Sequence, residues 1–225
     1  GADASSLFNV ITGYSRPPEY KHFIVAPHGM RSFFEYMIRQ ETENAKKGLP
    51  SGITVKVNSL VDPKIIELLY EASKAGVRVQ LIVRGICCLI PGIEGVSENI
   101  TVMSIVGQLL EHSRIFRFEN AGNPRIYMGS ADWMPRNLDR RVELVFPIED
   151  ETQKARAFGI LDTMLSDTTN ARFMQSDTSY EHVDLRGKKK ISSQLTFYHE
   201  AQARLKELQS IEKDSVLIPI HSAEE

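Results

Sequence analysis

Residues 53–85 read ITVKVNSLVDPKIIELLYEASKAGVRVQLIVRG and contain a strand, a helix and a second strand in succession. Polar and apolar residues alternate in ITVKVN (53–58), as they do in a strand with two different faces. Asp62 is a favourable N-cap for a helix, and Pro63 fits the first turn that follows it. VRVQLIV (77–83) is apolar enough to form a buried strand. This order of elements indicates an α/β domain whose helices cover a largely buried sheet.

Short β-branched runs and longer amphipathic stretches alternate on both sides of this region. Upstream, the pattern predicts a strand over 22–26 and a helix over 31–47. Downstream, strands are expected at 101–105, 114–118, 125–128 and 142–147, and helices at 151–165 and 191–211. The pattern weakens between 172 and 190, where no element is assigned. We therefore predict an α/β fold with a mixed β-sheet flanked by helices on both faces.

The composition excludes several classes of protein. The 225 residues are 42% hydrophobic and 25% charged, and the net charge of −2 gives no overall field that would draw the chain to nucleic acid. Cys87 and Cys88 are neighbours and form no disulfide framework, which favours a reducing cytoplasm. No apolar run approaches the roughly 18 residues of a membrane span. Because the chain begins with Gly1, we expect a piece of a longer protein.

Arg84 is the first candidate binding residue, because it follows a buried strand directly and precedes Gly85. Ligands of open α/β sheets gather beyond the carboxyl ends of the strands. An arginine there offers a planar fork to phosphate oxygens, and each charge-assisted hydrogen bond contributes about 1.5–3 kcal/mol. The alternative is a surface arginine whose stem lies along apolar neighbours.

His112 is the second candidate, in the segment LEHSR (110–114) at the start of a predicted strand. Two residues apart in a strand, His112 and Arg114 point to the same face. A bound phosphate favours a protonated imidazole beside it, so His112 is suited to proton transfer at a phosphate oxygen. The alternative is a structural histidine whose hydrogen bonds are satisfied at a helix end beside Glu111.

A third group of candidates lies in GSADWMPRN (129–137), after another predicted strand. Its glycine lets the backbone approach a ligand closely, and Ser130 and Asp132 can orient a neighbouring histidine. Arg136 and Arg141 place two more cations nearby. The three groups together suggest a phosphate site assembled from several strand ends.

HSR (112–114) and GSAD (129–132) resemble the signature of the phospholipase D superfamily, which reads H-x-K and, after a gap, G-S-x-N. This chain has Arg114 in place of the lysine and Asp132 in place of the asparagine. Both replacements still serve phosphate binding and the orientation of a histidine, but they weigh against phosphodiester hydrolysis. The resemblance implies a phospholipase D-like sandwich.

Longer segments are similar to one family, the bacterial polyphosphate kinases. They include LPSGITVKVN (49–58), LIVRGICCLIPG (81–92), LEHSR (110–114) and SADWMPRNLDRRVE (130–143). The chain looks like the second, carboxyl-terminal phospholipase D-like catalytic domain of such an enzyme. The resemblance implies a linker or leading helix from the preceding domain over 1–19, the catalytic domain over 20–210 and a flexible tail over 211–225.

In that family the terminal phosphoryl group of ATP moves reversibly onto inorganic polyphosphate. The resemblance implies that Arg84 and His112 contact nucleotide phosphates and that His112 assists catalysis. The histidine that becomes phosphorylated and the Mg²⁺ ligands lie in a portion that is missing here, so no metal ligand is expected in this chain. Further cations expected along the phosphate path are Lys56, Arg114, Arg136 and Arg141.

The expected partners are ATP or ADP, polyphosphate and the upstream domains of the same polypeptide, within a homo-oligomeric enzyme that binds no nucleic acid. The expected location is the cytoplasm, with peripheral membrane association as an alternative. Two other functions stay open, a phosphodiesterase of the phospholipase D superfamily and a binding or oligomerisation module without catalysis. The kinase assignment requires His112 and Arg84 to lie at one anion site.

Overall fold

The computed structural model describes residues 1–16, 19–187 and 189–214. The helices are α1 (Ala2–Ile11), α2 (Met30–Lys46), α3 (Pro63–Lys74), α4 (Pro135–Asp139), α5 (Glu151–Leu165) and α6 (Ser193–Asp214), with a short 3-10 helix, η1, at Asn120–Gly122. The strands are β1 (Ile24–Ala26), β2 (Gly52–Val57), β3 (Arg78–Val83), β4 (Ile100–Ile105), β5 (Ile115–Phe118), β6 (Arg125–Gly129), β7 (Glu143–Pro147), β8 (Ala171–Met174) and β9 (Tyr180–His182). They form one sheet in the order β1-β7-β6-β5-β2-β3-β4-β8-β9.

The sheet is mixed, because β2, β3 and β4 run parallel while β5 pairs antiparallel with both β2 and β6. Val57 at the end of β2 lies opposite Val83 at the end of β3. Ile115 at the start of β5 lies opposite Lys56 of β2 and Met128 of β6. The ends of β2, β3 and β6 and the beginning of β5 therefore meet at one edge of the sheet.

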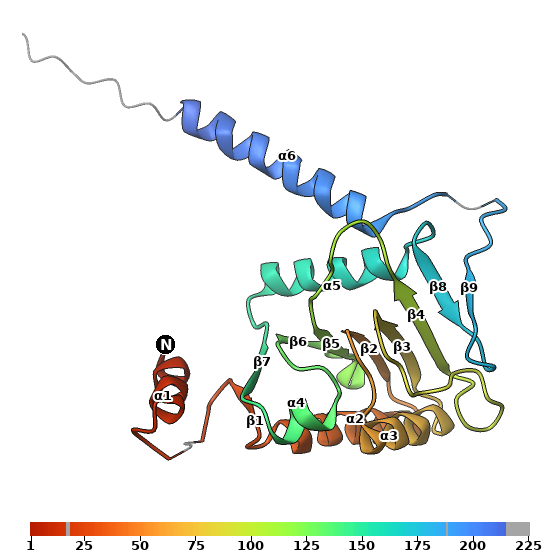
Figure 1. Cartoon of the computed structure of the whole chain (residues 1–225), viewed down its shortest axis with the longest axis horizontal. Coiled ribbons are helices and arrows are strands. Elements are labelled where there is room, and N and C mark those ends of the chain that lie inside the picture. The colour runs from red at the N-terminus through yellow and green to blue at the C-terminus, as the bar shows by residue number, and fades with distance from the viewer. Residues whose placement is uncertain (17–18, 188, 215–225) are drawn as a thin grey trace, which may run out of the picture.

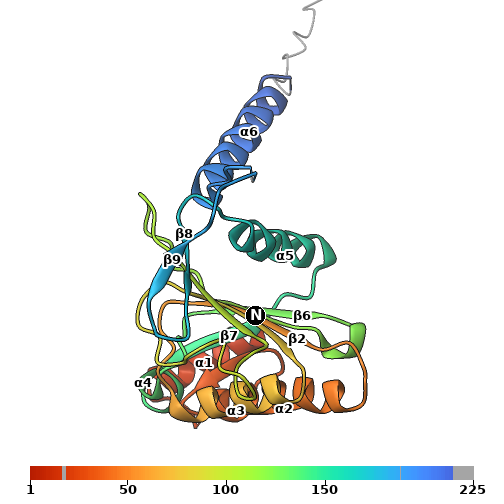
Figure 2. The ribbon, with the colours of Figure 1, turned by 90° about the vertical axis from the view of Figure 1, so that its right-hand side faces the viewer.

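Helices cover both faces of the sheet, as predicted. Helices α2 and α3 lie along one face and α5 lies along the other, while α6 extends away from the body (Figures 1 and 2). The predicted α/β class with a mixed, helix-flanked sheet is confirmed. None of the helices in the described ranges has both the length and the apolar character needed to cross a membrane.

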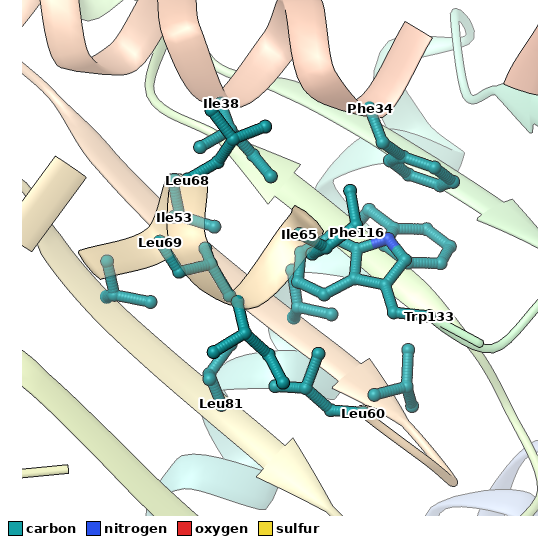
Figure 3. Packing of buried hydrophobic residues seen from close by; sticks show 14 of the residues in the cluster. Phe34, Ile38, Ile53, Leu60, Ile65, Leu68, Leu69, Leu81, Phe116 and Trp133 are labelled. Atoms are coloured by element: carbon teal, nitrogen blue, oxygen red, sulfur yellow. The ribbon is translucent and has the colours of Figure 1, made fainter. Parts of the chain in front are cut away.

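The larger core lies between the sheet and the α2–α3 layer. Phe34 of α2 packs over Phe116 and the buried Trp133, with the Phe34 and Trp133 rings edge to face at 5.6 Å between centroids, while Ile38 of α2 lies beside Leu68 of α3 (Figure 3). Alternate residues of β2 face this core, so Lys56 and Asn58 face the α5 side of the sheet. A strand that is otherwise apolar thus places two polar side chains beside the edge where the strands end.

Sequence signals at helix ends are largely correct, but some short elements were missed. Asp62 caps α3 through Ile65 N at 3.0 Å, as predicted. Strands β8 and β9 lie in the region where no element was assigned, and α4 is a single turn that was not predicted. Helix α6 continues to Asp214, so the first four residues of the expected tail (211–225) are helical, and 215–225 lie outside the described residues.

Candidate functional site

The candidate site lies at the sheet edge where β2 and β3 end. Asn58 follows β2, Arg84 follows β3, residues 112–114 lead into β5, and residues 130–132 follow β6. Because β5 runs antiparallel to β2 and β6 while β3 runs parallel to β2, segments far apart in the sequence are brought together. The three groups of residues singled out in the sequence therefore share one edge of the sheet.

Arg84 is half-buried and is held by uncharged partners. Its Nε donates to Asn58 Oδ1 at 2.9 Å, and its backbone N donates to Val57 O at 3.2 Å. Ser104 Oγ donates to the Arg84 carbonyl at 3.2 Å. Among the described residues, no carboxylate forms an ion pair with the Arg84 guanidinium. Its positive charge is therefore not compensated within the part of the chain that the structure covers.

Arg114 connects Asp132 to His112. Its Nε and Nη2 donate to Asp132 Oδ1 and Oδ2 at 3.2 and 3.0 Å. Its Nη1 lies 2.8 Å from both His112 Nδ1 and the His112 carbonyl oxygen, and Nη2 lies 3.3 Å from His112 Nε2. Most donors of this arginine are thus engaged inside the protein, so Arg114 supports His112 in this state.

Lys56 is buried with a partner of opposite charge. Only 2% of its side chain is exposed, and Nζ lies 2.8 Å from Glu111 Oε2 and donates to Ser113 O at 3.1 Å. Burial lowers the pKa of Lys56, against the opposing effect of Glu111. Burial alone would raise the pKa of Glu111, but hydrogen bonds from Lys56 and Ser113 outweigh it and hold that pKa below its usual value. Lys56 therefore anchors the segment that carries His112.

The remaining predicted residues lie around this centre. Ser130 Oγ donates to Glu143 and accepts from Leu144 N at 3.1 Å, and none of its hydrogen bonds in the described ranges reaches His112. Asp132 acts on His112 through Arg114 and not by direct contact. The orienting role expected for Ser130 thus has no direct contact to support it.

Arg136 lies in α4, and Arg141 follows that helix. Both residues are exposed, and neither side chain forms an ion pair with a residue that the structure describes. They are available for an anion. Within the described residues, no hydrogen bond connects either side chain to His112, Arg114 or Asp132. Their expected role on a phosphate path stays a prediction.

A cavity of about 810 Å³ lies next to the site, between α5, α6 and the sheet. Glu111 and Ser113, on either side of His112 in the sequence, contribute to its wall, which is otherwise mostly apolar and includes Ile160, Phe197 and Leu205. Neither Arg84 nor His112 lines it. His112 is exposed, which leaves it accessible to a ligand or to another part of a longer protein.

Comparison with known proteins identifies the family. A family model described as "Polyphosphate kinase C-terminal domain 2" matches residues 23–194. The chain belongs to the polyphosphate kinase family. The resemblance inferred from the sequence is confirmed.

Polyphosphate kinases from several bacteria are similar to this chain. The protein from Lactiplantibacillus plantarum is 50% identical over 206 residues, which cover 92% of this chain and 29% of that protein. The protein from Parasynechococcus marenigrum is 53% identical over 180 residues, 80% of this chain and 25% of that protein. The crystal structure of polyphosphate kinase from Porphyromonas gingivalis superposes with a TM-score of 0.86 at 36% identity, covering 90% of this chain and 31% of that one. The chain spans less than a third of the length of these relatives.

The polyphosphate kinase resemblance also implies Mg²⁺. In the described part of the chain, His, Cys, Asp and Glu side chains do not gather in a group of three or more that could hold a metal ion. Glu111 and Asp132, two carboxylates of the candidate site, are already paired with Lys56 and Arg114. The residues that the structure describes therefore do not fit a magnesium site.

Two residues of this candidate site were missed in the sequence. Asn58 joins Arg84 to Asp132, because its backbone N donates to Asp132 Oδ1 at 2.7 Å. Glu111 was considered only as a neighbour of His112, yet it pairs with Lys56 from β2. The available signal for Asn58 was its polarity, because Lys56 and Asn58 stand at alternate positions where a fully buried strand would have apolar residues.

Gly129→Ala is expected to destabilise the fold by about 1–3 kcal/mol or more, because overpacking forces the backbone apart. A Cβ at this position would lie 2.3 Å from Leu144 O and 2.9 Å from Val145 Cα. Chemical denaturation monitored by circular dichroism measures the effect. The matched control is Gly159→Ala in α5, where a Cβ meets nothing within 4 Å and should stabilise the helix slightly. Equal stability of the two variants would show that β6 and β7 are not packed as described.

Proposed function

We propose that this domain supplies Arg84 and His112 to the reversible transfer of the terminal phosphoryl group of ATP to inorganic polyphosphate, within a longer kinase. Phosphoryl transfer depends mainly on placement and on positive charge around the equatorial oxygens. In this proposal the upstream domains of the same polypeptide provide the phosphorylated histidine and the Mg²⁺ ligands. The complete enzyme is proposed to be a cytoplasmic homo-oligomer that binds ATP or ADP and polyphosphate.

The uncompensated charge of Arg84 carries this proposal. Arg114 is paired with Asp132 and Lys56 with Glu111, whereas the partner of the Arg84 guanidinium among the described residues is the uncharged amide of Asn58. A half-buried guanidinium without a counter-ion attracts an anion more strongly than an ion-paired one does. The planar fork of an arginine also matches the oxygens of a phosphate group.

The arrangement around His112 also supports a phosphate ligand. Both ring nitrogens of His112 face N–H groups of Arg114. A neutral imidazole has a single acceptor nitrogen, so the other nitrogen carries a proton that needs an acceptor. A phosphate oxygen supplies that acceptor and would place His112 in position to exchange a proton with the transferring group.

The chain alone is expected to bind inorganic tripolyphosphate weakly, with an affinity that falls as salt is added. By analogy with nucleic acids, a single phosphate-contacting cation, Arg84, predicts a loss of roughly three- to fourfold between 50 and 200 mM salt. Isothermal titration calorimetry at the two concentrations measures this. Arg125→Ala, which removes an exposed cation at the opposite end of β6, serves as the control and should bind as the wild type does. Absence of heat at both salt concentrations would contradict a preformed site.

The purified chain is expected to make no polyphosphate from ATP and Mg²⁺, because the proposed reaction needs groups that this chain lacks. Incubation with radiolabelled ATP, followed by separation of long polyphosphate, measures the product. A full-length polyphosphate kinase under the same conditions is the positive control. Synthesis of polyphosphate by the chain alone would show that the domain carries a complete active site.

A phosphodiesterase is the weaker alternative. The single H-x-R element of this chain has Arg114 held by Asp132 and His112, so the residue in the lysine position is largely committed to internal partners in this state. Membership of the polyphosphate kinase family favours phosphoryl transfer over phosphodiester hydrolysis.

A further inference from the structure

Asn58 occupies the junction between the two halves of the site. It follows β2 and is only 5% exposed. Its side-chain Oδ1 accepts from Arg84 Nε at 2.9 Å, and its backbone N donates to Asp132 Oδ1 at 2.7 Å. Asp132 in turn holds Arg114, which holds His112. A single residue therefore connects the Arg84 side to the His112 side.

The backbone of Asn58 also fixes the turn that carries Arg84. Gly85 N donates to the Asn58 carbonyl oxygen at 2.8 Å, and a Cβ at Gly85 would lie 2.9 Å from that oxygen. The approach of the two backbones thus requires glycine at position 85. Side chain and backbone of Asn58 act together on residues 84 and 85.

We propose that Asn58 is a positioning residue that aims the Arg84 guanidinium at the anion site without cancelling its charge. The other two buried cations of the site are held by carboxylates, Lys56 by Glu111 and Arg114 by Asp132. An amide oxygen directs an arginine N–H as a carboxylate does, but it carries no net charge. The charge of Arg84 therefore stays available for a phosphate group. This inference rests on the function proposed above.

The chemistry of the contact settles which amide atom faces Arg84. Arginine Nε can only donate, so its partner must be the Asn58 carbonyl oxygen. Asn58 Nδ2 is then left buried without a hydrogen-bond partner among the described residues. Packing alone would favour an apolar side chain at such a position. The polar residue is thus explained by its contact with Arg84.

Two substitutions of Asn58 separate the positioning of Arg84 from the neutralisation of its charge. Asn58→Leu removes the acceptor with little change in volume and breaks the single hydrogen bond that this side chain makes within the described residues. It should weaken tripolyphosphate binding by about tenfold, and Asn58→Leu added to Arg84→Ala should weaken it no further. Asn58→Asp keeps an acceptor for Arg84 but adds a counter-charge, so binding should weaken while Arg84 stays in place. Thr54→Val, an equally buried polar-to-apolar change on the same face of β2, is the control and should leave binding unchanged.

The ¹⁵N–¹H signal of Arg84 Nε, assigned by its loss in Arg84→Lys, tests the contact without any ligand. It should shift and exchange faster with water in Asn58→Leu, and it should persist in Asn58→Asp and Thr54→Val. An unchanged Arg84 signal in Asn58→Leu, or additive losses of affinity in the double variant, would overturn the inference. If the wild-type chain binds no tripolyphosphate, the proposed function fails for this chain, and the signal still decides whether Asn58 holds Arg84.

Discussion

Lys56→Met is expected to lower the free energy of unfolding by about 3–5 kcal/mol, the cost of leaving a partly buried charge without its partner. The Lys56 ammonium is the counter-ion of Glu111 and also binds the Ser113 carbonyl, so its loss affects both sides of His112. The side chain of Glu111 is only 20% exposed, and water cannot fully replace the lysine. Urea denaturation of the two proteins measures the difference.

The control for this prediction is the substitution of an exposed cation. Arg125→Met, at the start of β6, should change stability by no more than about 0.5 kcal/mol. Adding Glu111→Gln to Lys56→Met should recover part of the loss, because the unpaired carboxylate is then removed. A Lys56→Met protein as stable as the Arg125→Met protein would mean that the ion pair does not support the site.

His112→Ala is expected to lower kcat for polyphosphate synthesis by roughly 10²–10⁴-fold in a full-length protein that contains this domain, as expected for loss of a general acid or base. Binding of tripolyphosphate by the isolated chain should change much less, because Arg84 keeps its contact with Asn58. Steady-state kinetics of the full-length protein and calorimetry of the chain give the two quantities.

His182→Ala is the matched control, since His182 is an exposed histidine on β9. It should leave kcat within about twofold of the wild type, in line with a surface substitution. A similar, small effect of both alanine substitutions would exclude His112 from proton transfer and would leave Arg84 as the contribution of this domain.

Much of the fold could be predicted because its signals are local. The strand, helix and strand of 53–83 are marked by alternation in β2 and by the Asp62 cap of α3, which need only neighbouring residues. Strand β9 has no such signal, because all its residues are exposed and no apolar periodicity results. Short edge strands of this kind depend on the neighbour that they pair with, here β8.

The candidate site was only partly predictable. The strand-end rule located Arg84, and the spacing of His112 and Arg114 at the start of a predicted strand located His112, but neither revealed which cations are neutralised. Glu111 and Lys56 are 55 positions apart, and their pairing follows from the antiparallel register of β2 and β5. The sequence therefore predicted five phosphate-path cations, whereas the structure shows that Lys56 and Arg114 have internal partners.

The strand register described above also limits how the site can move. Asn58, Arg84 and Arg114 adjoin the ends of three strands that are joined by ladder hydrogen bonds, so their spacing cannot change without breaking the sheet. Such a surface behaves as a fixed template and not as a gate. Opening and closing steps, which limit turnover in many enzymes, then require a hinge outside this sheet.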